Sequence, residues 1–211
     1  MKKYLIFTDL DGTLLDHENY SYGNNKKTIT SIINNENDVI FNTSKTFSES
    51  INLLKKLNLT NMPFSTENGA LLYFPKNRFK KIKNSSDYGK YWKIRIAKLS
   101  SKNWHQFLLK KQKKFKLLIA QDLPSKILKK YTNLDNTSKM LNREASQIIL
   151  WEDSLVNLKK FKNELRSEKQ GVLIQGSRFM QVSSVCNKRI AKKLISHVYD
   201  HQFYGTYFKN T

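Results

Sequence analysis

Two acidic side chains near the N-terminus are the residues of this chain best placed to do chemistry. Asp9 and Asp11 follow the apolar segment 4–8, which has the length of a buried strand, and Gly12 comes directly after them. A strand alternates its faces, but the chain leaves the strand here, so both carboxylates can turn toward one point. Carboxylates that lie this close repel each other, and a hard cation such as Mg²⁺ relieves the repulsion. One carboxylate can then attack a phosphorus atom while the other transfers a proton.

Two other kinds of acidic turn could account for the same residues. An EF-hand loop needs a glycine at its sixth position and a glutamate at its twelfth, and neither is present here. An acidic surface turn without a function is the other alternative. The apolar strand that leads into the pair and the glycine that follows it favour the catalytic interpretation.

A possible phosphate site follows the second predicted strand, 38–42. The hydroxyl of Thr43 and the amides after it, from Ser44 and Lys45, could hold a phosphoryl oxygen, and the Lys45 ammonium could add positive charge. The alternatives are a plain helix N-cap for Thr43 and a surface position for Lys45. Lys188 begins the last predicted helix and could neutralise charge on a transferring phosphoryl group. In a chain with 38 basic residues, one lysine carries little signal by itself.

The predicted order of elements explains how these residues could meet. Apolar segments predict strands, and a helical period between them predicts helices: strands at 4–8, 38–42 and 64–74, the last broken at 67–69, and helices at 26–35 and 48–57. This β-α-β-α-β order predicts right-handed crossovers and a parallel sheet. Ligands of such sheets bind at the carboxyl ends of the strands, where Asp9, Asp11 and Thr43 fall.

The middle of the chain, 78–184, predicts a second α/β layer. It contains predicted helices at 91–99, 104–111, 124–131 and 154–168, predicted strands at 147–151, 172–175 and 178–183, and an ambiguous segment at 115–120. The final predicted helix covers 188–201. We therefore expect the second layer, 78–184, to be inserted between the two parts of the first, 1–77 and 185–211.

Composition sets further limits on the function. A chain of 211 residues with 39% hydrophobic residues can build a packed core. The net charge of +21 comes mostly from lysine scattered along amphipathic segments, which favours solvated helix faces over a nucleic-acid surface and attracts anionic small molecules. Cys186 is the single cysteine, so no intrachain disulfide can form, as is typical of the reducing cytoplasm. No apolar run approaches 18 residues, so no membrane partner is expected.

Several motifs resemble those of a known family. Residues 9–13, Asp-Leu-Asp-Gly-Thr, resemble the first motif, DxDGT, of the haloacid dehalogenase superfamily, whose members are mostly phosphatases. Segments 67–75, 143–151 and 175–179 resemble the signatures ENGAxIYxP, REASEPILW and QGGRF of the mannosyl-3-phosphoglycerate phosphatase family. These matches run in order over nearly the whole chain.

The resemblance implies both a fold and an activity. It implies an α/β fold with a Rossmann-like parallel-sheet core, incomplete at its C-terminal end, and an inserted α/β cap that sets substrate specificity. It also implies Mg²⁺-dependent hydrolysis of mannosyl-3-phosphoglycerate, which leaves the osmolyte mannosylglycerate. The glucosyl analogue stays open as a substrate.

The resemblance also implies roles for individual residues. Asp9 would be the nucleophile that forms an aspartyl-phosphate, and Asp11 would protonate the leaving oxygen and then activate water. Asp9 and the Asp11 carbonyl would bind Mg²⁺. The implied phosphate site consists of Thr43, Ser44, Lys45 and Lys188. The implied cap contacts to the sugar phosphate are Arg143, Glu144, Ser146, Gln175 and Arg178, with cap salt bridges or surface positions as the alternatives for each.

The sequence also departs from the family pattern. The acidic fourth motif of the superfamily, GDxxND, which supplies a further contact to Mg²⁺, does not occur before the last residue, Thr211. Arg189, Ser177 and Ile148 replace two glycines and a proline of the family signatures. These departures predict that this chain alone is a weak or inactive phosphatase. The alternative function is that of an inactive, truncated relative that binds sugar phosphates or a complementing chain.

Overall fold

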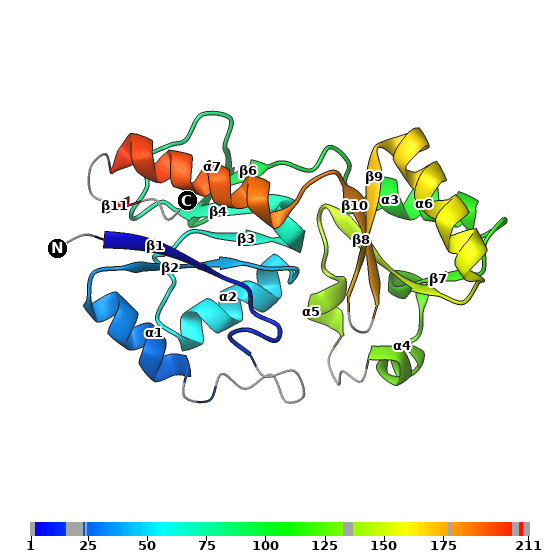
Figure 1. The fold of residues 1–211 in the computed structure, drawn as a ribbon, viewed down its shortest axis with the longest axis horizontal. Coiled ribbons are helices and arrows are strands. Elements are labelled where there is room, and N and C mark those ends of the chain that lie inside the picture. The colour runs from blue at the N-terminus through cyan, green and yellow to red at the C-terminus, as the bar shows by residue number, and fades with distance from the viewer. Residues whose placement is uncertain are drawn as a thin grey trace. The chain divides into compact units, whose positions relative to one another are not determined.

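The computed structural model describes residues 3–15, 23, 25–132, 137–176, 179–203 and 207–208 (Figure 1). The chain forms two compact units. The first comprises Met1–Lys45, Glu49–Ile96 and Asn187–Thr211, and the second comprises Thr46–Ser48 and Ala97–Cys186. The α/β fold class predicted from the sequence is confirmed, because both units combine a β-sheet with helices.

The first unit is built on a mixed sheet with the strand order β11-β1-β2-β3-β4-β6-β5. Its strands are β1 (Lys3–Thr8), β2 (Asp38–Asn42), β3 (Phe64–Thr66), β4 (Leu71–Pro75), β5 (Ser86–Tyr88), β6 (Tyr91–Arg95) and β11 (Tyr207–Phe208). The pairs β1–β2 and β2–β3 are parallel, as predicted, and β11 adds to β1 in parallel as well. The pairs β3–β4, β4–β6 and β5–β6 are antiparallel, so the sheet is parallel only in the half that carries the acidic pair.

Helices cover both faces of this sheet. The helices α1 (Asn25–Asn34) and α2 (Phe47–Lys56) lie on one face, and α7 (Lys188–Gln202) lies on the other (Figure 1). The buried residues of α7 recur every three or four positions, which is the period of a helix with one apolar face. They pack against Ile40, Leu72 and Phe74 of the sheet, so the start of α7 is tied to the strands that carry the acidic and hydroxyl side chains.

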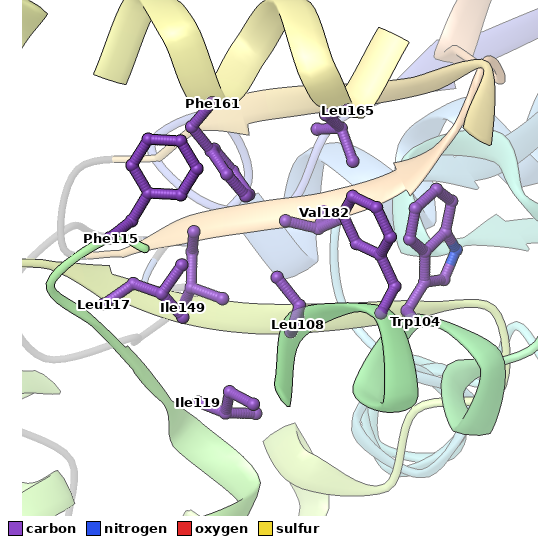
Figure 2. Close-up of a cluster of buried hydrophobic side chains, with 10 residues drawn as sticks. Trp104, Leu108, Phe115, Leu117, Ile119, Ile149, Phe161, Leu165 and Val182 are labelled. Atoms are coloured by element: carbon purple, nitrogen blue, oxygen red, sulfur yellow. The ribbon is translucent and has the colours of Figure 1, made fainter. Parts of the chain in front are cut away.

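The second unit is an antiparallel sheet with helices packed on it. Its strand order is β7-β8-β10-β9, formed by β7 (Leu117–Ile119), β8 (Ser146–Trp151), β10 (Met180–Ser184) and β9 (Gly171–Gln175). Its helices are α3 (Ser101–Lys111), α4 (Ser125–Thr132), α5 (Ser138–Leu141), α6 (Leu155–Lys169) and the short 3₁₀ helix η2 (Ala120–Asp122). Figure 2 shows how Trp104 and Leu108 of α3 and Phe161 and Leu165 of α6 converge over Val182 of β10.

The segment predicted as a helix at 91–99 is a strand, and that prediction was wrong. Trp92, Ile94 and Ile96 recur every second residue and pack against the core of the first unit, whereas Tyr91 faces the other side, against Phe64. Since β6 pairs with β4, it extends the first sheet. Residues 78–96 therefore belong to the first compact unit, whereas the sequence placed the start of the cap at residue 78.

Candidate active site

The acidic pair lies at the carboxyl end of β1, where a tight turn begins. The Gly12 amide donates to the Leu15 carbonyl at 3.0 Å, and the Leu15 amide donates back to the Leu10 carbonyl at 2.8 Å. Gly12 has a φ of 70°, a left-handed conformation that glycine adopts without steric cost. The buried side chains of Leu10 and Leu15 anchor the turn from below. The polar loop is therefore held in place by its apolar residues.

The register of β1 and β2 brings the predicted residues together. Thr8 pairs with Phe41 in the parallel ladder, so Asp9 and the residues that follow Phe41 leave the sheet side by side. This is the arrangement that the element order predicted. Thr43 comes two residues after Phe41 and is completely buried.

Each carboxylate of the pair has an ammonium partner. Lys188 Nζ donates to Asp9 Oδ2, and Lys45 Nζ lies 2.8 Å from Asp11 Oδ1. The other oxygen of Asp9, Oδ1, accepts the Leu10 amide at 2.7 Å. The side chains of Asp9 and Asp11 are 36% and 35% exposed, so a ligand can reach both. The two ammonium groups offset the repulsion between the carboxylates and give the site charges of both signs.

Thr43 stabilises the loop between β2 and α2, which also contains Lys45. Its amide donates to the Ser65 carbonyl at 3.3 Å, and its Oγ1 accepts the Lys45 amide at 3.2 Å. Helix α2 begins only at Phe47, so Thr43 is not the N-cap that one interpretation of the sequence allowed. Ser44 is half-buried in the same loop. The structure therefore brings Asp9, Asp11, Thr43, Ser44, Lys45 and Lys188 to one end of the first sheet.

The 3₁₀ helix η1 (Glu67–Gly69), which connects β3 to β4, stabilises this loop through backbone hydrogen bonds. The Glu67 amide donates to the Lys45 carbonyl, and the Asn68 amide donates to the Thr43 carbonyl, both at 2.9 Å. Glu67 and Asn68 have φ values of 50° and 59°, which are uncommon for residues with side chains. Backbone strain of this kind persists only where the surroundings impose it. The segment 67–75, quoted above as a signature, thus has a structural role that its sequence did not reveal.

The donor types in this cluster fit a magnesium ion. Mg²⁺ prefers oxygen ligands, needs only one or two carboxylates and keeps several waters. The Asp9 carboxylate and the Asp11 carbonyl offer such oxygens beside a partly exposed surface. Within the part of the chain that the structure describes, no group of three or more His, Cys, Asp or Glu residues could hold a metal.

The predicted cap residues do not form one cluster. Arg143 is buried, and its Nη1 donates to Ser146 Oγ at 3.2 Å, so these two meet at the start of β8. Glu144 is half-buried, and its carbonyl accepts the Ser101 amide at 2.8 Å. Gln175, the last residue of β9, is exposed. It pairs with Met180 at one end of β10, whereas Ser146 pairs with Ser183 near the other end. Arg178 lies outside the described residues.

Sequence reasoning missed one residue of the site, Asn42. It is the last residue of β2, and its Nδ2 donates to the Lys188 carbonyl at 2.8 Å. A polar residue directly after the apolar run 39–41 was the available signal. The partner lies 146 positions away in the sequence, and no local pattern connects the two.

In the part of the chain that the structure describes, none of the helices has the length and apolar character needed to cross a membrane.

Comparison with solved structures places the fold. The chain is similar to protein 0175 of Thermoplasma acidophilum, with a TM-score of 0.65 and 16% identity over 95% of this chain and 73% of that one. It is also similar to a haloacid dehalogenase-like hydrolase from Bacteroides thetaiotaomicron, with a TM-score of 0.63 and 14% identity over 93% of this chain and 77% of that one. At these identities the likeness shows the fold alone, which is the predicted Rossmann-like α/β fold.

Comparison of sequences goes further. A glucosyl-3-phosphoglycerate/mannosyl-3-phosphoglycerate phosphatase of Methanococcoides burtonii is 31% identical over 207 residues, which are 95% of this chain and 75% of that protein. The sequence model of the haloacid dehalogenase-like hydrolases matches residues 6–201, a span that begins in β1 and ends in α7. That span includes the acidic pair, the Thr43 loop and Lys188, so the chain belongs to the haloacid dehalogenase-like hydrolase family.

Proposed function

We propose that this chain is a phosphatase that hydrolyses a glycosyl-3-phosphoglycerate through an aspartyl-phosphate on Asp9. The observation that carries the proposal is the cluster at the end of the first sheet, where the Asp9 carboxylate contacts Lys188 beside the buried Thr43. A partly exposed nucleophile and cation, with a buried hydroxyl in the adjoining loop, are groups that phosphoryl transfer uses. The substrate class is supported by the similarity to the relative from Methanococcoides burtonii.

In the first step, an oxygen of Asp9 attacks the phosphorus atom of the substrate. The bond between phosphorus and the glycerate oxygen breaks, and Asp11 gives its proton to that oxygen as it leaves. Lys45 contacts Asp11 Oδ1, which leaves Oδ2 as the oxygen that exchanges the proton with the leaving group. The Lys188 ammonium and the Thr43 hydroxyl stabilise the negative charge on the phosphoryl oxygens.

In the second step, Asp11 removes a proton from water, and the water oxygen attacks the phosphorus atom of the aspartyl-phosphate. The bond between phosphorus and the Asp9 oxygen breaks, which releases inorganic phosphate and restores the Asp9 carboxylate. Asp9 and the Asp11 carbonyl would hold a Mg²⁺ ion, which supplies further positive charge to the phosphoryl oxygens when it is bound.

The second unit supplies candidate contacts to the rest of the substrate. The Arg143 guanidinium is a planar fork that matches a carboxylate such as that of glycerate, and Ser146 holds one of its nitrogen atoms. Ser146, Glu144, Gln175 and Arg178 remain candidates for contacts to the sugar. The proposed partner of this chain is thus a small sugar phosphate.

The test is phosphate release from mannosyl- and glucosyl-3-phosphoglycerate by the purified chain with Mg²⁺. We expect slow turnover, as the departures from the family pattern predict, and a kcat lowered further by at least about 10³-fold in Asp9→Asn because that variant lacks the nucleophile. Acid quenching should trap phosphate on the wild type and not on Asp9→Asn. Turnover that survives in Asp9→Asn would contradict the mechanism. Binding of both substrates without any phosphate release would instead support the alternative of an inactive relative.

A further inference from the structure

The side-chain amide of Asn42 joins three elements of the first unit. Asn42 ends β2, one residue before Thr43, and its side chain is nearly buried. Its Nδ2 donates to the carbonyl of Lys188, the first residue of α7, at 2.8 Å. Its Oδ1 accepts the hydroxyl of Ser65, a fully buried residue of β3, at 2.5 Å. One amide therefore links β2 and β3 to the start of α7.

The partners also determine which way the amide faces. The Lys188 carbonyl can only accept a hydrogen bond, so the NH₂ group of Asn42 must point toward it. The oxygen of the amide then faces Ser65, whose hydroxyl can donate. The two bonds are made together, and rotation of the amide would break both. This arrangement makes Asn42 a rigid link.

A second close approach holds α7 from another side. Gly69 of η1 has a φ of 85°, and a Cβ atom built on it would lie 2.5 Å from the Asn187 carbonyl oxygen. Asn187 is the N-cap of α7, and its side chain accepts the Ile190 amide at 2.9 Å. The residue before Lys188 is thus packed against η1, while the carbonyl of Lys188 itself is held by Asn42.

We propose that Asn42 is a positioning residue that fixes the first turn of α7 and so places the Lys188 ammonium against Asp9. This inference rests on the proposed function, because it assigns a role in phosphoryl transfer to the position of Lys188. Asn42 does not touch the reacting atoms in this scheme and acts through the Lys188 backbone.

The ion pair between Lys188 and Asp9 is too exposed to fix the position of the Lys188 ammonium by itself. The side chains of Lys188 and Asp9 are 33% and 36% exposed, and partly solvated ion pairs contribute little to holding a geometry. Lysine also has a long, flexible side chain, so the location of its ammonium depends on the position of its backbone. In catalysis, a displacement of about 1 Å can cost roughly 10²-fold in rate. A buried, doubly bonded amide at the helix start supplies the missing rigidity.

The experiment compares Asn42→Ala with a matched control, Asn37→Ala. Asn37 lies just before the other end of β2 and also bridges backbone groups, accepting the Tyr4 amide at 2.9 Å and donating to the Ile32 carbonyl at 3.3 Å. We expect Asn42→Ala to lower kcat about tenfold with little change in KM, Ser65→Ala to show a smaller loss of the same kind, and Asn37→Ala to keep the wild-type kcat. In the Lys188→Ala background, Asn42→Ala should change kcat by less than twofold.

A second measurement does not depend on turnover. Spectra of chain labelled with ¹⁵N-lysine should show an ammonium signal that disappears in Lys188→Ala. We expect this signal to shift or broaden in Asn42→Ala and to stay unchanged in Asn37→Ala. An unchanged signal in Asn42→Ala would overturn the positioning role, as would a kcat within twofold of the wild type. A wild type that releases no phosphate would refute the proposed function, while the spectra would still decide the role of Asn42.

Discussion

Lys45 forms an ion pair with Asp11, with its Nζ 2.8 Å from Asp11 Oδ1. The sequence assigned this lysine to the phosphate, yet in the structure it contacts the proposed acid and base. Both assignments place it in the same cluster, but they predict different defects when it is removed. A lysine that binds phosphate should affect KM, whereas a lysine that orients Asp11 should affect the proton-transfer step and hence kcat.

We expect Lys45→Ala to lower kcat about tenfold while KM changes less than threefold. General acid–base catalysis contributes roughly 10²–10⁴-fold, and a carboxylate without its ion-pair partner should lose part of that contribution. Steady-state kinetics with mannosyl-3-phosphoglycerate would measure both constants. Lys102→Ala, at an exposed position of α3, is the control and should leave both unchanged. A rise in KM at constant kcat would favour the phosphate role.

We expect Arg78→Ala to destabilise the first unit by about 3 kcal/mol. Arg78 binds Asp38 through both of its terminal nitrogens, at 2.5 and 3.2 Å, and Tyr199 donates to the same carboxylate at 2.8 Å. The Asp38 side chain is only 6% exposed, so loss of the guanidinium would leave a buried charge without its partner. Unfolding in urea would measure the change in free energy.

The double variant Asp38→Asn/Arg78→Met serves as the control for this charge argument. It removes both charges and keeps apolar volume beside Phe79 and Tyr199, which the guanidinium now covers. We expect it to unfold at a higher urea concentration than Arg78→Ala. Equal stability of the two variants would show that lost packing, and not the unpaired carboxylate, causes the destabilisation.

We expect the stability of the second unit to depend on pH through Glu164. Hydrogen bonds from Lys111 and then Lys114 lower the pKa of Glu164 below its ordinary value. A carboxylate with a lowered folded-state pKa stabilises the fold at pH values above its unfolded pKa of about 4.3, and this contribution is lost as the pH falls through the folded pKa. Urea unfolding between pH 7 and pH 3 should show a drop of about 0.5–1 kcal/mol that Glu164→Gln lacks.

We expect the stability of the second unit to depend on pH at high pH through Lys111. Burial acts to lower the pKa of Lys111, but its hydrogen bonds to Glu164 and Glu168 raise the pKa overall. Its contribution to stability is therefore complete below the unfolded pKa of lysine, about 10.4, and is lost as the pH rises through the folded pKa. If the stability difference between the wild type and Glu164→Gln fell between pH 5 and pH 8, both assignments would be contradicted.

We expect Gly171→Ala to destabilise the second unit by about 1–3 kcal/mol. A Cβ atom on Gly171 would lie 2.6 Å from Trp104 and 2.8 Å from Leu165, both of which are completely buried. Urea unfolding monitored by tryptophan fluorescence would measure the loss. Combining the change with Trp104→Phe should cost less than the sum of the two single variants, because the smaller ring leaves room for the methyl group. Additive losses would argue against overpacking as the cause.

The residues at the end of the first sheet could be predicted because they depend on local order. Asp9 and Thr43 each follow an apolar strand, and parallel pairing alone brings such positions together. The antiparallel half of the sheet could not be predicted in the same way. In segment 91–96, the apolar residues 92, 94 and 96 alternate as in a strand, and the helix prediction missed this period, which the pairing with β4 confirms.

The contacts of individual charged groups depended on three-dimensional packing. The Asn42 amide meets Lys188 only after β2, β3 and α7 have been assembled, so no pattern within one segment could reveal it. Lys45 has a flexible stem that reaches several groups from one backbone position, and its sequence position did not select among them. In the second unit, Arg143 and Ser146 are three residues apart and do meet, whereas Gln175 is separated from Ser146 by the length of β10.

The two compact units differ in how their chain segments are ordered, and this has a consequence for synthesis on the ribosome. Nearly all of the second unit comes from the uninterrupted stretch Ala97–Cys186. The core of the first unit joins Leu5 and Ile40 to Ile195 and Tyr199. The apolar surface of its N-terminal strands therefore stays uncovered until α7 has left the exit tunnel. The second unit can fold earlier. The strands that carry Asp9 and Thr43 are the ones most exposed to aggregation or chaperone capture during that interval.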